Sequence, residues 1–294
     1  SFILYEDRHG NWMDWHKNPP SNPTEKFDMD YYNQELHTLE QIPGIAKNRI
    51  VRLHLARRTD SEGEAVKFPG SMRKLTCLTH LYLSNVNLTN CKYLPKNLQV
   101  LFLDNCNVQS FEGLPQSLRY FSCNKTKFEN FPNCPSSLPH LTHFFMASPY
   151  LRNFEGLSTN LPKLLVFHLN FGEKLEDFTG LPPQLPELTI VRMWGEQNHN
   201  QIASFRGWPQ TLPNCEIFDV RWGHFQNFRG IPTFPRINHE VQERRQDVEE
   251  RFVRLFVNIH NLDGFPPPSW YYKTHKIDTL MGNPSIGRYM FSSI

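Results

Sequence analysis

The sequence lacks the features that mark membrane proteins and nucleic-acid-binding proteins. No apolar run approaches the roughly 18 residues that a membrane-spanning helix needs. Lys and Arg together number 31, against 29 Asp and Glu, so the chain has no clear excess of positive charge to bind phosphate backbones. We therefore expect no membrane segment and no nucleic-acid partner.

The sequence also lacks the motifs of common catalytic and metal sites. It contains no glycine-rich phosphate-binding loop, no Gly-x-Ser-x-Gly nucleophile motif and no His-Glu-x-x-His. Its six cysteines include no Cys-x-x-Cys pair, which argues against a zinc site. The Asn-His-Asn segment at 198–200 is interpreted as a polar loop rather than a nuclease motif. We therefore predict no catalytic residue, no metal and no cofactor, and we expect that the chain is not an enzyme.

The cysteines are dispersed along the chain. Cys106 and Cys123 fall at apolar positions of the pattern described below and are predicted to be buried thiols. Dispersed cysteines favour a reducing, intracellular compartment. The sequons at Asn87 and Asn124 keep a secreted origin open. Because the chain begins at Ser1 rather than at Met, we also expect a trimmed N-terminus.

The sequence is rich instead in one short motif, Phe-x-Gly-Leu-Pro. A degenerate copy, FPNCP, begins at Phe131, and prolines recur after the motifs, as in LPPQLPEL. Proline inside a helix removes a hydrogen-bond donor and clashes with the preceding turn. These segments are therefore predicted to be extended turns and not helices. Five copies or close variants begin at Phe111, Phe154, Phe178, Phe205 and Phe228.

A second pattern, Leu-x-x-apolar-x-apolar, alternates with the first. It is typical of a short strand that buries one face. One such strand cannot bury its apolar side alone, so neighbouring repeats must stack on it. The first apolar residues of the pairs are spaced 20 to 28 residues apart, at Leu53, Leu81, Leu101, Phe121, Phe144, Phe167, Val191 and Phe218.

Three consecutive segments match the longer pattern L-x-x-L-x-L-x-x-N/C-x-L, with Val86, Cys106 and Thr126 at the Asn/Cys position. The segments are LTHLYLSNVNL from Leu78, LQVLFLDNCNV from Leu98 and LRYFSCNKTKF from Leu118. Over residues 49–235 the chain therefore resembles the leucine-rich-repeat superfamily. The resemblance implies an α/β-type solenoid, a right-handed arc of about eight repeats. It places a parallel β-sheet on the concave face and extended, proline-rich segments on the convex side.

The Leu-Pro-x-x-Leu elements are similar to those of secreted bacterial effectors and of some protist repeats. Bacterial repeats of this kind keep a fixed short length, whereas several repeats here reach 23 to 27 residues. An effector ligase of that type also carries a catalytic cysteine beside its repeats. No cysteine follows Cys215, so that activity is not predicted for this chain.

The Phe-x-Gly motif is predicted to be structural. Its phenylalanines recur at one position of the repeat, where stacked rings would form a spine that fills the core. Its glycines are expected to adopt a turn conformation that side chains disfavour. They are Gly113, Gly156, Gly180, Gly207 and Gly230.

The flanks of the repeats differ from them in composition. Residues 1–48, which contain Trp12 and Trp15, are predicted to be an N-terminal cap, followed by the repeats at 49–235. In 236–294 an amphipathic pattern predicts a capping helix of about 20 residues from Asn238, followed by an aromatic, proline-rich tail. The apolar positions of the helix are Val241, Val248, Phe252, Leu255, Phe256 and Ile259.

With no catalytic motif, function is expected to come from the concave strand surface. Exposed aromatic and Arg side chains are enriched at binding hot spots, so a protein or peptide partner is predicted there. Alternatively, the chain is the substrate-recognition part, adaptor or receptor, of a larger enzyme or ligase complex whose effector domain lies outside this chain. The segment LEQIPGIAKNRIVRL has only a faint similarity to an F-box. The predicted partner-binding residues are Tyr82, Phe102, Tyr120, Phe145, His168, Arg192, Trp194 and Arg221.

Overall fold

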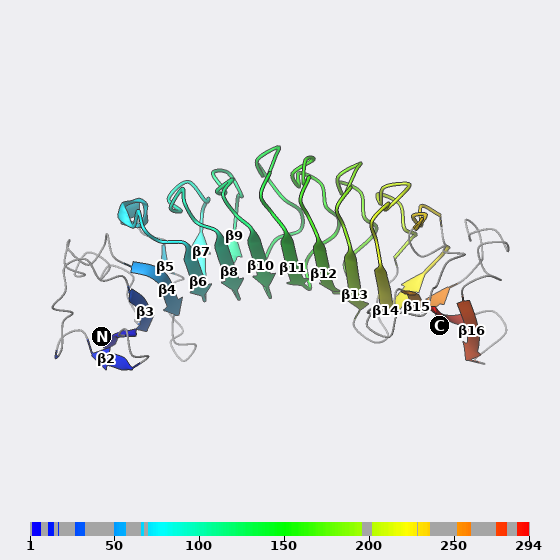
Figure 1. The fold of residues 1–294 in the computed structure, drawn as a ribbon, viewed down its shortest axis with the longest axis horizontal. Coiled ribbons are helices and arrows are strands. Elements are labelled where there is room, and N and C mark those ends of the chain that lie inside the picture. Colours follow the sequence, from blue (N-terminus) through cyan, green and yellow to red (C-terminus); the bar gives the residue numbers. More distant parts are fainter. Residues whose placement is uncertain are drawn as a thin grey trace, which may run out of the picture.

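The computed structural model describes twelve stretches of the chain: 2–6, 11–14, 17, 27–32, 50–56, 66–67, 70–195, 202–227, 229–235, 252–259, 275–280 and 287–293. In these residues the protein is a parallel β-solenoid with a sheet of 14 strands. The strands lie side by side in a curved row, with their connecting segments on the outer side of the curve (Figure 1). The sheet therefore forms the concave face.

Eight parallel strands form the middle of this sheet. The eight apolar positions predicted from the sequence, from Leu53 to Phe218, pair with one another in a single row across it, which confirms the predicted register. The strands are β4 (Ile50–Ala56), β6 (His80–Ser84), β8 (Val100–Asp104), β10 (Tyr120–Asn124), β11 (His143–Ser148), β12 (Val166–Phe171), β13 (Ile190–Gly195) and β14 (Ile217–Phe225).

Both ends of the sheet continue beyond the predicted repeats. At the N-terminal end, β3 (Phe27–Tyr32) pairs parallel with β4, and β1 (Phe2–Glu6) and β2 (Trp12–Asp14) follow in antiparallel order. At the C-terminal end, β15 (Phe252–Ile259) pairs parallel with β14. The antiparallel strands β17 (Gly287–Ser293) and β16 (His275–Leu280) complete that end. Trp15 lies outside the described residues.

The return segments hold almost no regular helix. A small parallel sheet of β5 (Val66–Lys67), β7 (Val86–Leu88) and β9 (Asn107–Val108) lies beside the main one. In the described part of the chain, helix is limited to the 3₁₀ turn η2 (Gly70–Lys74). Those residues contain no helix with the length and apolar character to cross a membrane.

The predicted C-terminal capping helix is wrong where the structure describes that region, and the described fold is a β-solenoid rather than an α/β one. Residues Phe252–Ile259 form strand β15. Their apolar side chains fit both helical and alternating spacing, and pairing with β14 decides between the two. Val253 and Leu255 pair in register with Phe218 and Val220, so β15 continues the parallel part of the sheet by one strand. Asn238, Val241 and Val248 lie outside the described residues.

The phenylalanine spine is confirmed. Phe111, Phe131, Phe154, Phe178 and Phe205 are all fully buried. The rings of Phe131 and Phe154 stack at a centroid distance of 6.1 Å, and those of Phe154 and Phe178 at 6.3 Å. Stacked rings at this one position link successive repeats through the core. Phe228 lies outside the described residues.

The glycine of the motif makes the turn that the sequence predicts. The Leu114 amide donates to the Phe111 carbonyl at 3.1 Å across a turn in which Gly113 has a φ of 85°. A positive φ at the third residue is typical of a type II turn and favours glycine. In the degenerate copy, Asn133 takes the same role with a φ of 57°. The repeated motif is therefore architectural.

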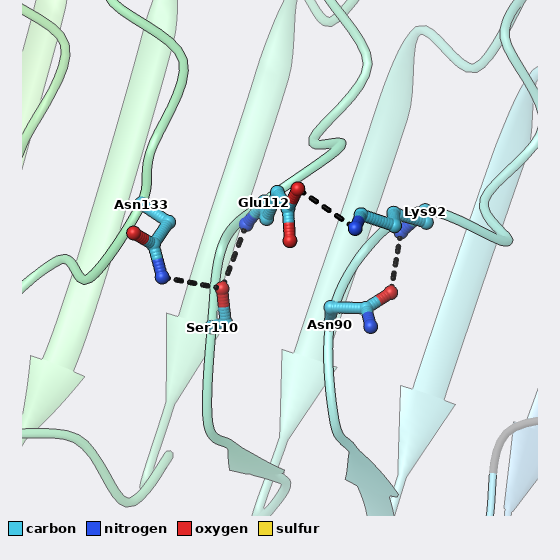
Figure 2. A network of polar contacts seen from close by, with 5 residues as sticks. All are labelled: Asn90, Lys92, Ser110, Glu112 and Asn133. Atoms are coloured by element: carbon cyan, nitrogen blue, oxygen red, sulfur yellow. Dashed lines mark hydrogen bonds and ion pairs between the residues drawn. The ribbon is translucent and has the colours of Figure 1, made fainter.

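A polar side chain caps most of these turns by accepting a hydrogen bond from the backbone N–H two residues later. The turn at Phe131 is the exception, because Pro132 has no N–H to donate. Figure 2 shows the amides of Lys92 and Glu112 donating to Asn90 Oδ1 at 3.0 Å and Ser110 Oγ at 3.1 Å. An ion pair of 2.7 Å joins Lys92 Nζ to Glu112 Oε1. Four later turns are capped in the same way, by Asn153, Asp177, Ser204 and Asn227. Such local side-chain bonds hold a backbone turn in place of a helix.

Candidate functional site

The concave face carries the side chains that alternate with the core positions. Along β6 the side chains of Leu81 and Leu83 are buried, while those of His80, Tyr82 and Ser84 are only partly buried. Because successive side chains of a strand point to opposite faces, the latter set lies on the concave surface. The middle row of that surface consists of His54, Tyr82, Phe102, Ser122, Phe145, His168, Arg192 and Asp219.

Aromatic rings form a continuous ladder across these strands. Tyr82 and Phe102 stack with their centroids 4.7 Å apart, which matches the spacing of adjacent strands. Ser122 interrupts the middle row, and Tyr120 from the neighbouring row bridges the gap: its ring stacks on Phe102 at 4.9 Å and on Phe145 at 5.0 Å. The predicted aromatic anchor residues therefore lie together.

The ladder extends further in both directions. Phe145 contacts the ring of His168 at 5.6 Å, and the rings of His168 and Trp194 pack in a T-shaped arrangement at 4.8 Å. The Arg221 guanidinium lies over the Trp194 ring at 5.8 Å. At the other end His54 contacts Tyr82 at 6.1 Å. We define the ring ladder as His54, Tyr82, Phe102, Tyr120, Phe145, His168 and Trp194, which spans seven strands from β4 to β13.

Beside the ladder lies a furrow of about 420 Å³. One wall consists of ladder rings, and the other is polar, with the side chains of Ser84, Asp104, Asn124 and Asn170. Asn124 Nδ2 donates to Asp104 Oδ1 at 2.7 Å, which fixes the orientation of both groups. The furrow thus offers apolar contact on one side and hydrogen-bonding groups on the other.

The predicted polar residues differ in their environment. Arg221 Nη2 donates to Asp219 Oδ2 at 2.6 Å and its Nε to Oδ1 at 2.9 Å, so this arginine neutralises a carboxylate that is almost fully buried. Such a bidentate pair holds the guanidinium over Trp194. Arg192 is exposed, lies next to His168 in the middle row, and forms no ion pair with the described residues. Arg192 is therefore the more available cation.

Two histidines of the concave face, His143 and His168, favour the neutral form. Burial lowers the pKa of His143, whose ring stacks on Tyr120 at 5.6 Å. Burial also lowers the pKa of His168, and it outweighs a hydrogen bond with Asn170 that raises this pKa; the positive charge of Arg192 lowers it as well. Burial disfavours the charged form of a base. Both rings therefore behave as aromatic contacts at neutral pH.

Sequence reasoning missed His54 as a member of the ladder. The signal was present, because RLHL in β4 has the same alternation as HLYL in β6 and pairs with it in register. The middle row therefore begins on β4, one strand before the first of the predicted partner-binding residues.

The cysteines have packing roles in the described residues. Cys106 and Cys123 are buried, as predicted. Burial raises the pKa of Cys91 to about 12 and that of Cys106 to about 11, so both remain thiols at neutral pH. Cys106 Sγ donates to the Leu83 carbonyl at 3.5 Å, which ties two neighbouring repeats together. Within the described stretches no group of His, Cys, Asp and Glu is arranged to hold a metal.

Comparisons with known proteins give no further guide to function. No family model matches the chain, and neither a curated protein nor a solved structure matches it.

Proposed function

We propose that the protein is a leucine-rich-repeat solenoid that binds a protein or peptide in extended form along its concave ring ladder. The row of eight paired apolar positions at 20- to 28-residue spacing supports the repeat assignment. The observation that carries the binding proposal is the ladder itself, whose stacked rings remain partly exposed across seven strands.

The furrow beside the ladder fits the chemistry of a peptide. Apolar side chains of a ligand would contact the rings of Tyr82, Phe102 and Phe145. The carboxylate of Asp104 and the amides of Asn124 and Asn170 would pair with backbone N–H and C=O groups. Aromatic anchors beside polar groups are the usual composition of a binding hot spot. Contiguous exposed apolar patches often mark binding sites.

The test uses the double substitution Tyr82→Ala with Phe102→Ala. A partner is first captured with the whole chain, and its affinity is then measured directly for both proteins. The double variant should stay folded, because both rings lie outside the core, and should bind at least about tenfold more weakly. The control is Tyr93→Ala, which removes an exposed aromatic ring from a return segment. Equal affinity of the folded double variant and the parent protein would place the binding site elsewhere.

A further inference from the structure

A second hollow, of about 770 Å³, adjoins the furrow at the carboxyl ends of strands β10 to β13. It shares Asn124 and Asn170 with the furrow, so one extended ligand can occupy both. Two exposed aromatic rings line it, Tyr150 at 38% and Trp194 at 37% exposure. Lys125 and Lys127 line it too, and we call it the lysine hollow.

The charge of the lysine hollow has one sign. Among the described residues no Asp or Glu lines it, and neither Lys125 nor Lys127 forms an ion pair with them. A third cation, Lys174, lies over the Tyr150 ring at 5.3 Å. By contrast, Lys92 and Arg152 on the return segments are paired with carboxylates. Unpaired cations of one sign in a concave surface attract anionic groups.

The backbone at Lys125 points to a role for its charge. Lys125 has a φ of 50°, in the left-handed region that most side chains disfavour. The equivalent positions after β6 and β8 hold Asn85 and Asn105, and asparagine adopts this conformation more readily. The backbone hydrogen bonds are equivalent as well. The Asn105 N–H donates to the Asn124 carbonyl, and the Lys125 N–H donates to the Ala147 carbonyl. Lysine therefore occupies a position where asparagine would strain the backbone less. Residues in such sparsely populated conformations are concentrated at binding sites.

We infer that the lysine hollow binds the carboxylates of an acidic peptide whose apolar side chains lie in the adjoining furrow. This inference rests on the proposed function and adds the charge of the ligand to it. Lys125 and Lys127 supply the ammonium groups, and the exposed rings of Tyr150 and Trp194 supply contact area beside them. Opposite charges of this kind steer the encounter and select among partners.

The test compares two fluorescein-labelled probes, a short peptide of alternating Leu and Glu and its counterpart with Gln in place of Glu. Fluorescence anisotropy should show the Glu peptide binding about tenfold more tightly at low salt, with the difference shrinking as salt is added. Lys125→Asn with Lys127→Gln should remove most of that difference. Lys163→Asn, which removes an exposed charge from a return segment, should leave it unchanged.

A stability measurement separates charge from structure. Lys125→Asn alone should not lower the melting temperature, because Asn suits the left-handed conformation. Weaker binding of the Glu peptide by a variant of equal or higher stability would therefore assign the effect to the lost charge. A lower melting temperature would show that Lys125 is there for the fold, which overturns the inference.

The remaining outcomes distinguish the two proposals. If the protein binds the Glu and Gln peptides with equal affinity, and Tyr82→Ala with Phe102→Ala weakens the binding of both peptides, the inference is overturned and the proposed function is retained. If binding depends on the lysines but not on the rings, the proposed function is overturned, and with it the placement of the peptide's apolar side chains in the furrow. Tighter binding of a heparin-derived sulfated oligosaccharide than of the Glu peptide, or no measurable binding of either peptide, overturns the inference.

Discussion

Two rows of stacked aromatic rings run along this solenoid, one inside it and one on its concave face. The inner row is the spine of Phe111, Phe131, Phe154, Phe178 and Phe205, all fully buried. The outer row is the ring ladder, most of whose rings are partly buried, and Trp194 is 37% exposed. The residue types and the stacking are similar, but the solvent exposure differs. We infer that the spine stabilises the fold and that the ladder is available for binding.

The two rows also differ in what surrounds them. The rings of the spine are covered on all sides, and the backbones of neighbouring turns come close to each other beside them. The ladder is bordered by the polar wall of the furrow, including Asp104 and Asn124. Substitutions in the first row should therefore change stability, and substitutions in the second should mainly change binding.

The largest expected effect is that of Phe178→Ala. The ring is fully buried between Phe154 and Phe205 and also contacts Trp208 at 5.6 Å, so its loss leaves a cavity. The free energy of unfolding should fall by about 3–5 kcal/mol. Urea unfolding followed by circular dichroism measures this change. An unchanged midpoint would contradict the role of the spine.

The turns of the spine should be nearly as sensitive. In Gly180→Ala the new Cβ would clash with the backbone of Phe154, and the residue has a φ of 95°. We expect a loss of at least about 2 kcal/mol, since a left-handed backbone alone costs about 1–2 kcal/mol. Asn133→Gly, at the equivalent turn of the degenerate copy, is the control and should stay within about 1 kcal/mol of the parent. Equal losses of unfolding free energy in Gly180→Ala and Asn133→Gly would contradict the role given to the positive φ and the close backbone contact at Gly180.

The ladder should contribute less to stability than the spine. Phe102→Ala removes a partly buried ring that stacks on Tyr82 and Tyr120. Each aromatic pair contributes about 0.5–1.5 kcal/mol beyond burial. We expect a loss of about 1–2 kcal/mol in urea unfolding, roughly half that of Phe178→Ala. A loss as large as that of Phe178→Ala would mean that the ladder is a second core.

The smallest expected effect is a pH dependence at His168. Burial lowers its pKa, so below about pH 6.5 the unfolded chain binds a proton more readily than the folded one. The stability associated with the neutral ring is present above that pH and is lost as the pH falls through the lowered pKa. The melting temperature should decline from pH 7 to pH 5, and His168→Gln should reduce the decline.

The control for this measurement is His140→Gln, because His140 is exposed on a return segment. Its decline should equal that of the parent protein. If the melting temperature of the His168→Gln variant declines with pH as much as that of the parent protein, His168 is not the cause of the decline.

Part of the candidate site could be predicted because strand register follows from the alternation of side chains. Once Leu81, Leu101 and Phe121 are aligned, Tyr82, Phe102 and Tyr120 must lie on the opposite face. The furrow and the lysine hollow could not be predicted in this way. They depend on where small side chains such as Ser122 and Ala147 leave space between strands, and on the position of Lys127 beyond the end of β10.

The sequence by itself determined the repeat register, the core rows and the turn glycines, because period-two alternation and a turn with positive φ are local properties of the backbone. Tertiary structure alone decided that Phe252–Ile259 is a strand, since its apolar residues fit both periods and pairing with β14 supplies the missing hydrogen bonds. It also decided that Tyr120 bridges the gap at Ser122, and that Asp219 is buried against Arg221. These outcomes depend on side chains from different strands meeting in space, which no single segment specifies.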